Sequence, residues 1–355
     1  MIMDIYVLDS STQILDTIDT FKSNIWTVQY FDTNDFELVV PATDKNIDLL
    51  QKDRLLCRDK DRDGDIWQNV MIIENIKIVA DREDGNKMTV SGRGLKSIVG
   101  RRVIWKQTNL TGKVETGIRQ VITENIINPD DEKRKIDNFI LNEPAGITDT
   151  FDIQALGDDL DEWITSTCQT YDIGWDVYIK GNKFVFKLYK GLDRSYNQKD
   201  RLPVVFSDEF DNLLASTYTY ERAEFKNAAL IGGEGEGVNQ RTTTIGDSSG
   251  LERYEAYIDG SSVSSNGAII TEEQYYKMLQ DYGKDELNTT SFTESFEGNV
   301  VPDGNYTLNQ DYFLGDVVQV INEYGISATP RIVEIIESED QNGTSTVPTF
   351  STWEV

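Results

Sequence analysis

Short runs of β-type residues dominate the first hundred positions of the chain. Val, Ile, Tyr, Phe and Trp alternate there with polar residues, and Asp, Asn and Gly separate the runs at intervals of about ten residues. This spacing predicts a small barrel or sandwich. The expected strands lie in "DIYVLD", "NIWTVQYF", "DFELVVP", "DRLLCR", "IWQNVMIIENIKIVA" and "KMTVSGRG".

The hydrophobic period becomes helical after this region. Apolar residues recur at helical spacing over 116–128 and stop before Pro129, which predicts one helix. A second helix is expected within 157–174, where acids fill the first turn and Gly174 offers an end. A third is expected to begin after Thr271, which is a favourable N-cap residue.

The β pattern returns between and after the helices. Gly181 and Asn182 form an expected turn between "WDVYI" and "KFVFKLY", so 104–205 is predicted to be an α+β domain. The Ser-, Thr- and Gly-rich segment 238–267 predicts an exposed loop or a strand-loop excursion. "DRLLCRDKDRDGDIWQNVMIIENI" and "DVVQVINEYGISATPRIVEII" both run from an Asp through alternating apolar residues to a turn glycine and an apolar run. We therefore predict a duplicated barrel motif.

The stretch "DKDRDGDIWQNV", 59–70, has the spacing of a calcium loop without its last ligand. Aspartates alternate from Asp59 and Gly64 takes the sixth position, but Val70 occupies the twelfth, where a bidentate Glu belongs. The flanking runs predict strands rather than helices, and Asp-Gly is a common hairpin turn. We therefore favour a solvated hairpin tip that the acids decorate. The alternative is a weak calcium site with Asp59, Asp61, Asp63 and Asp65 as ligands.

Charge limits the possible partners. The chain has 355 residues and a formal charge of −28, with 62 acidic against 34 basic side chains. Such a surface disfavours contact with phosphates, so we expect no sequence-specific nucleic acid binding. No apolar window reaches the ~18 residues that a membrane span needs, and no signal peptide is recognisable, so no membrane anchor is expected.

Catalytic and cofactor chemistry is weakly represented. The chain has no histidine, which removes the Ser-His-Asp and Cys-His routes and most catalytic zinc sites. Cys57 and Cys168 stand among apolar residues and are expected to be buried free thiols. The glycine-rich "IGGEGEGVN" lacks the Gly-Lys-Ser/Thr ending of a phosphate loop and carries two repelling glutamates. We expect neither an enzyme nor a cofactor, and assign no catalytic residue.

Tryptophans are spread along the predicted strands, which favours packing in cores and subunit interfaces. A carbohydrate-stacking face is the alternative. The six are Trp26, Trp67, Trp105, Trp163, Trp175 and Trp353.

Five blocks together resemble the tail-hub proteins of long-tailed bacteriophages and prophages, a siphovirus tail-protein family similar to the baseplate hub of contractile tails. The blocks follow the family's order and cover nearly the whole chain. They are "FKSNIWTVQYFDTNDFELVVP", "SGRGLKSIVGRRVIW", "FVFKLYKGLDRSYNQ", "KNAALIGGEGEG" and "LNQDYFLGDVVQVINEYGISATPRIVEIIES".

The resemblance implies a mainly β fold with α+β insertions, in which two related tube-forming β-barrel domains carry peripheral α+β domains, as in a phage baseplate hub. It implies a homotrimeric hub ring of pseudo-sixfold symmetry that closes or extends the tail tube at the tail tip. Implied partners are further copies of the chain, the distal tail protein, tail-tube proteins, and tail fibre or tip proteins. The implied location is the virion, after assembly in the bacterial host cytoplasm.

Domain boundaries follow from the patterns and the resemblance together. We expect a first tube barrel at 1–103, a peripheral α+β domain at 104–205, a second tube barrel at 206–237 and 299–355, and an inserted loop and helix domain at 238–298. Arg101 and Arg102 are candidates for contacting acids of a neighbouring subunit, although an exposed pair would contribute little.

An alternative function is a carbohydrate-binding or cell-wall-degrading tail module. Larger relatives continue into a peptidoglycan hydrolase or a receptor-binding extension, whereas this sequence stops at "TFSTWEV". A lytic or fibre role is therefore expected to be absent here or to be carried by another chain.

Overall fold

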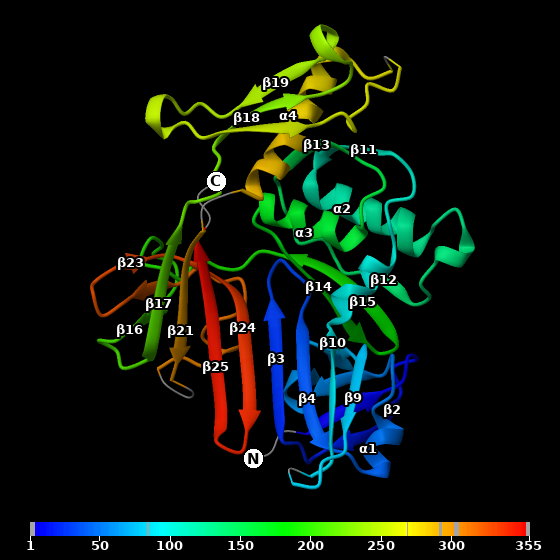
Figure 1. Cartoon of the computed structure of the whole chain (residues 1–355), viewed down its shortest axis with the longest axis vertical. Helices are drawn as coiled ribbons and strands as arrows, with labels where there is room; N and C mark the ends of the chain where they lie inside the picture. Colours follow the sequence, from blue (N-terminus) through cyan, green and yellow to red (C-terminus); the bar gives the residue numbers. More distant parts are fainter. Residues whose placement is uncertain (1–3, 84, 268, 291–292, 302–304, 353–355) are drawn as a thin grey trace.

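The computed structural model describes residues 4–83, 85–267, 269–290, 293–301 and 305–352. The chain is mainly β, as expected, and its described strands form six sheets. The largest is an eight-stranded antiparallel sheet in the order β17-β21-β25-β24-β3-β4-β10-β9 (Figure 1). Its strands are β3 (Ser23–Gln29), β4 (Asp35–Pro41), β9 (Asn75–Val79), β10 (Lys87–Arg93), β17 (Leu213–Glu221), β21 (Thr293–Val300), β24 (Arg331–Asp340) and β25 (Gly343–Thr352).

This sheet consists of two halves that come from opposite ends of the chain. The first half contains β3, β4, β10 and β9, and the second contains β17, β21, β25 and β24. In each half the strands lie in the order first, second, fourth and third along the chain. The shared order agrees with the duplicated motif predicted from the sequence.

A smaller sheet covers one face of each half. Behind the first half lies the sheet β2-β1-β5-β8, and Trp26, Phe36 and Leu56 are among the side chains buried between the layers. Behind the second half lies β16-β22-β23, with Phe206 and Phe350 in the core. These elements are β1 (Ile5–Leu8), β2 (Ile14–Ile18), α1 (Asp44–Leu49), β5 (Leu55–Arg58), β8 (Met71–Ile72), β16 (Val205–Ser207), β22 (Gln319–Ile321) and β23 (Ser327–Ala328). Within the described residues no sheet closes on itself, so each half is a two-layer sandwich.

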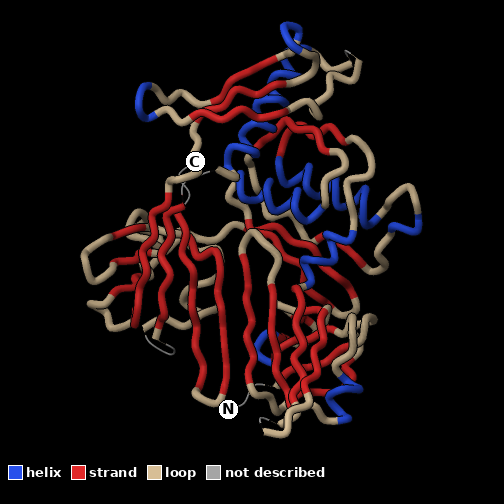
Figure 2. The backbone as a smooth tube through the Cα atoms, viewed as in Figure 1, coloured by secondary structure: helices blue, strands red, loops and turns tan. Residues whose placement is uncertain are grey.

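An α+β part lies beyond one end of the large sheet and contains most of the longer helices (Figure 2). Its helices pack with the five-stranded sheet β12-β15-β14-β7-β6 and the pair β11-β13 around the largest core of the chain. The elements are β6 (Arg62–Asp63), β7 (Ile66–Trp67), β11 (Thr108–Lys113), α2 (Val114–Ile122), the π-helical η3 (Thr123–Ile127), β12 (Phe139–Leu141), β13 (Thr150–Ala155), α3 (Leu160–Thr170), β14 (Gly174–Lys180) and β15 (Lys183–Tyr189). Short 3-10 turns are η1 (Asp59–Asp61), η2 (Leu95–Arg101), η4 (Glu132–Arg134), η5 (Gly237–Asn239) and η6 (Gly250–Glu252).

A further unit at the far end consists of the sheet β19-β18-β20 and α4 (Figure 1). Its elements are β18 (Ala228–Gly232), β19 (Thr242–Ile245), β20 (Glu255–Asp259) and α4 (Glu272–Asn288). Thr271 and Gln274 form a capping box at the start of α4, which confirms the predicted N-cap. The second tube domain predicted from the sequence included 206–237. Within that segment, β18 pairs with β19 and β20 of this unit and does not join the large sheet.

The helix at 116–128 is confirmed as α2 with its π-helical continuation. The predicted end of the next helix at Gly174 is wrong, because α3 stops at Thr170 and Asp172 takes the left-handed conformation. Gly174 instead begins β14, where a Cβ would lie 2.2 Å from the ring of Tyr30. Close packing, rather than helix termination, requires this glycine.

Candidate functional site

The two halves of the large sheet meet at one seam, where β24 pairs with β3. Seven consecutive pairs run from Glu334 opposite Gln29 to Asp340 opposite Ser23. The seam joins strands that are about three hundred residues apart in sequence, so it forms only when both halves have folded.

A buried ion cluster fixes this seam on its core side. The Arg58 guanidinium donates through Nε to Asp61 Oδ2 at 2.5 Å and through Nη1 to Glu337 Oε2 at 2.9 Å. It also lies 5.1 Å from the ring of Trp26, the residue opposite Glu337 in the seam. Lys60 forms a second ion pair with Glu337. The cluster therefore connects β5 and η1 of the first half to β24 of the second.

Burial and charge oppose each other at Glu337. Burial of its carboxyl raises the pKa, but the charges of Arg58 and Lys60 and their hydrogen bonds lower it, and the net shift of the pKa is downward. The Arg58 side chain is only 1% exposed. A guanidinium this deeply buried needs its carboxylate partners, because an unpaired buried charge is costly.

A second contact, on Tyr30, joins three parts of the molecule. Its hydroxyl accepts a hydrogen bond from Gly191 N at 3.2 Å and donates one to Tyr189 O at 3.4 Å. Arg331 of the second half lies 5.4 Å from the ring and pairs with Asp172 of the α+β part. Burial raises the pKa of Tyr30 to about 12, so it remains a neutral hydrogen-bonding group.

Two glycines let the segments cross beside Tyr30. A Cβ on Gly191 would lie 1.7 Å from Gly315 O, and one on Gly315 would lie 2.3 Å from the ring of Tyr30. Gly315 also has a φ of +92°. Only glycine fits this crossing, because backbone atoms of 315–316 occupy the space of a side chain at Gly191 and the ring of Tyr30 occupies it at Gly315.

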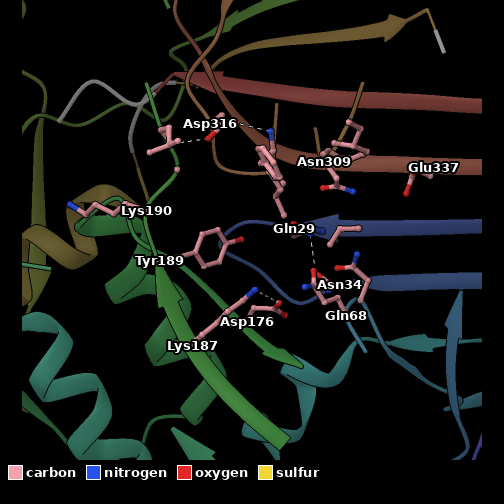
Figure 3. A pocket seen from close by; sticks show the side chains of 18 of the residues that line it. Gln29, Asn34, Gln68, Asp176, Lys187, Tyr189, Lys190, Asn309, Asp316 and Glu337 are labelled. Atoms are coloured by element: carbon pink, nitrogen blue, oxygen red, sulfur yellow. Dashed lines mark hydrogen bonds and ion pairs between the residues drawn. The ribbon is translucent and has the colours of Figure 1, made fainter. Parts of the chain in front are cut away.

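A cavity of ≈ 320 Å³ with both polar and apolar lining residues lies between these three parts. Figure 3 shows that Gln29 and Asn34 of the first half, Asp176, Lys187 and Tyr189 of the α+β part, and Asn309, Asp316 and Glu337 of the second half surround it. Each charged residue of its lining has an ionic partner. The pairs are Lys187–Asp176 at 3.3 Å, Lys190–Asp149 at 2.8 Å, Arg194–Asp316 at 2.5 Å and Arg58–Glu337 at 2.9 Å. The Arg194–Asp316 and Arg58–Glu337 pairs help to hold the three parts together.

The structure places the acidic stretch 59–65 in a hairpin, as predicted, and Asp63, Gly64 and Asp65 at its tip are exposed. β6 and β7 pair around Gly64, whose φ is +60°. β7 then pairs with β14, Trp67 opposite Ile179, and extends the sheet of the α+β part. The hairpin therefore links the first half to the α+β part, a role that depends on a strand more than a hundred residues away.

The four aspartates of the calcium hypothesis have different surroundings. Asp61 Oδ1 accepts from Asn69 Nδ2 at 2.7 Å, and its other oxygen binds Arg58. Asp59 Oδ1 accepts from the hydroxyl of Tyr6, while Asp63 and Asp65 are exposed. Across the described ranges, no three His, Cys, Asp or Glu side chains are grouped as a metal site. The calcium site stays a hypothesis for a chelation experiment.

Arg101 and Arg102 have partners within the chain. Arg102 Nε donates to Arg134 O at 2.6 Å, and Arg101 lies 4.0 Å from Asp53. Burial lowers the pKa of Arg102, and the neighbouring charges of Arg134 and Arg101 lower it further. Their contact with a neighbouring subunit stays a prediction. Cys57 and Cys168 are buried free thiols, as expected.

Sequence reasoning did not find the residues that carry the seam. Arg58 and Glu337 are separated by 279 positions, and neither belongs to a motif. The one available signal was Arg58 itself, a charged residue that ends the apolar run "RLLCR". A charge in such a run predicts a buried partner, but not which acid provides it.

The fold is that of solved prophage tail proteins. The tail protein from Neisseria meningitidis MC58 superposes with a TM-score of 0.61 at 13% identity, over 99% of this chain and 96% of that one. The 43 kDa tail protein of prophage MuSo2 from Shewanella oneidensis gives 0.59 at 16% identity, over 98% of both chains. Prophage tail protein gp18 from Listeria monocytogenes EGD-e gives 0.54 at 13% identity, over 99% and 94%.

The family follows from the sequence itself. Residues 4–350 match the family model of the siphovirus ReqiPepy6 Gp37-like proteins, and the chain belongs to this family. The resemblance to siphovirus and prophage tail proteins is thereby confirmed. A search of curated protein sequences found no match. Within the part of the chain that the structure describes, no helix has the length and hydrophobicity needed to cross a bilayer.

Proposed function

We propose that this protein is a structural subunit of a siphovirus-type tail, in which three copies form a hub ring that closes or extends the tail tube. Family membership and the tail-protein fold support a tail component. The single observation that carries the ring is the way the two halves of the large sheet join. The third strand of the second half, β24, pairs with the first strand of the first half, β3.

This contact is head-to-tail, so the same contact is possible between chains. The strands at the ends of the described sheet are β17 and β9, which are the first strand of the second half and the third strand of the first half. β9 of one chain therefore fits β17 of the next as β24 fits β3 within one chain. A head-to-tail contact closes into a ring when its rotation permits, and two similar halves in each of three chains give pseudo-sixfold symmetry.

The side chains on β9 support this contact. Ile76 and Ile78 lie opposite Val90 and Met88, so they belong to the core face of the sheet, yet they are 40% and 50% exposed. On β17, Tyr220 is 52% exposed. Apolar side chains exposed on an edge strand favour association with another strand, although Lys77 between the two isoleucines adds one charge to this edge. Closing the ring would bury these side chains beside those of the neighbouring chain.

In this ring the sheet face without a covering layer would line the channel. The core face of each half is already covered by a small sheet. On the opposite face of the first half, Ile25, Glu37 and Ser91 lie side by side on neighbouring strands. Ile25 and Glu37 are exposed, and Ser91 is half-buried. The remaining partners that we propose are the tail-tube proteins, the distal tail protein and fibre or tip proteins, with the virion as the location. We propose no enzymatic step for this chain.

The test is the assembly state of the purified protein. We expect light scattering to give three times the chain mass, and negative-stain images to show a ring with a central hole. A monomer at every concentration up to several milligrams per millilitre, with no rings in the images, would overturn the proposal. The cell-wall-degrading alternative predicts that this chain alone clears purified peptidoglycan in a zymogram.

A further inference from the structure

A cleft of ≈ 620 Å³ in the α+β part has an unusual lining. It opens between the start of β11, the helix α2 with η3, and the loop 128–134. Among the described residues that line it, Trp105 alone is aromatic or aliphatic, and the others are amides, carboxylates, cations and one threonine. Trp105 is 63% exposed, whereas Trp26, Trp67 and Trp175 are buried in cores.

The Trp105 ring is held in place on one side. The Arg134 guanidinium stacks 4.8 Å from its centroid and donates through Nη2 to Val103 O at 2.7 Å and to Asn125 Oδ1 at 3.2 Å. Asn125 Oδ1 also accepts from the backbone N of Trp105 at 3.1 Å. With one face of the ring supported by Arg134, the other face is a preformed apolar platform, which lowers the entropy cost of binding a ligand.

Hydrogen-bonding groups surround this platform. Gln120 Nε2 donates to Glu124 Oε1 at 2.8 Å, and Glu124 Oε2 accepts from Thr108, which leaves acceptor positions on both carboxylate oxygens. The backbone N of Asn128 donates to Thr123 O at 2.8 Å, whereas its side-chain amide has no hydrogen-bond partner among the described residues. Planar amides and carboxylates suit pairs of adjacent hydroxyls, since each offers two donors or acceptors in one plane.

This chemistry selects one class of ligand. The binding energy of protein interfaces is concentrated in well-packed, desolvated patches. The cleft offers a protein partner a single apolar residue, Trp105, so a protein ligand is disfavoured. A nucleobase could stack on the ring, but Glu124, Asp130 and Asp131 would repel its phosphates. A pyranose ring presents polarised C–H groups on one face, which suit the negative face of an indole, and hydroxyls around its edge. We propose that the Trp105 cleft binds a neutral oligosaccharide.

The test is calorimetric titration of the full chain with three neutral oligosaccharides: the hexamers of β-1,4-linked N-acetylglucosamine, β-1,4-linked glucose and α-1,4-linked glucose. We expect at least one to bind with a micromolar to millimolar Kd. Trp105→Ala should weaken that binding by about tenfold or more, and Trp105→Phe should retain most of it. Asn128→Ala should weaken it severalfold.

Tyr196→Ala is the matched control, because Tyr196 is 55% exposed and lies outside the cleft. It should bind as the wild type does. Binding of none of the three sugars, or binding that Trp105→Ala leaves unchanged, would overturn the proposal. Light scattering on the same variants keeps this test separate from the hub proposal, because loss of sugar binding in Trp105→Ala should leave the assembly state unchanged.

Discussion

At the scale of single residues, Arg58 is the side chain whose burial has the largest consequence. It lies in β5, yet its partner Glu337 lies in β24, so one guanidinium connects the two halves of the large sheet. The ion pairs of the cluster stabilise the fold only while the guanidinium and both carboxylates are present. Removing the cation leaves two carboxylates, of Glu337 and Asp61, without their buried counter-charge.

We therefore predict that Arg58→Met lowers the free energy of unfolding by about 3–5 kcal/mol. Urea denaturation followed by tryptophan fluorescence measures it. The control is Lys45→Met, which removes an exposed pair with Asp16 and should leave the free energy of unfolding within experimental error. Equal effects of the two variants would show that burial of the cluster contributes nothing.

Asp285 makes the stability of the folded chain depend on pH. It lies on α4, and burial of its carboxyl raises the pKa to about 7, with a downward contribution from a hydrogen bond with Thr170 and upward contributions from the charges of Asp281 and Glu286. Its Oδ1 is buried without a hydrogen-bond partner among the described residues. The folded state thus holds a proton that the unfolded chain releases above its ordinary pKa of 3.8. Stability is therefore lost as the pH rises from about 4 to 7.

Asp285→Asn should remove this dependence. The variant is expected to be more stable than the wild type at pH 8, by on the order of 2–4 kcal/mol, and to differ little at pH 4. Thermal melts across this range measure the difference. Asp247→Asn, on an exposed loop, is the control and should follow the wild type at every pH. A variant that parallels the wild type throughout would contradict a raised pKa.

At the scale of elements, β9 is an edge strand of the large sheet that exposes two isoleucines. Ile78→Lys places a charge on its exposed core-face side chain. We predict that this variant is a folded monomer at concentrations where the proposed trimer of the wild type forms, because the charge would be buried against the neighbouring chain. Light scattering measures the mass. Ile14→Lys, which alters a comparably exposed residue on β2, should remain trimeric.

The hairpin of β6 and β7 supports a prediction about metal. Because Asp61 uses both oxygens within the chain and Asp59 binds Tyr6, we expect a chelator to leave the melting temperature unchanged. Melts in the presence of EDTA and of millimolar calcium check this. A rise of several degrees with calcium, absent from Asp63→Asn, would instead establish the weak site considered from the sequence.

At the scale of the whole molecule, charge opposes assembly. Each chain carries a formal charge of −28, so three chains in the proposed ring would repel one another. We predict that the proposed trimer dissociates more readily at about 10 mM salt than at about 300 mM, since added salt screens this repulsion. Light scattering over a dilution series at both ionic strengths measures it. A trimer that weakens as salt increases would indicate that intersubunit ion pairs, such as those proposed for Arg101 and Arg102, dominate.

The sequence alone determined most of the local structure. Alternating apolar residues specified the strands of the first half, the spacing around Ile118 specified α2, and Thr271 with Gln274 specified the start of α4. These features depend on neighbours within one strand or one helical turn, so a local pattern contains them. The five blocks that resemble tail proteins identified the family in the same way.

Only the tertiary structure decided which elements meet. That β24 pairs with β3, that β7 joins β14, and that Glu337 neutralises Arg58 depend on contacts between segments more than a hundred residues apart. The tertiary structure also decided that Trp105 is exposed. Nothing in the sequence around Trp105 distinguishes it from the buried tryptophans, and only its surroundings in the fold differ. Burial is a property of the assembled layers, and a hydrophobic pattern identifies the face of a strand without identifying what covers it.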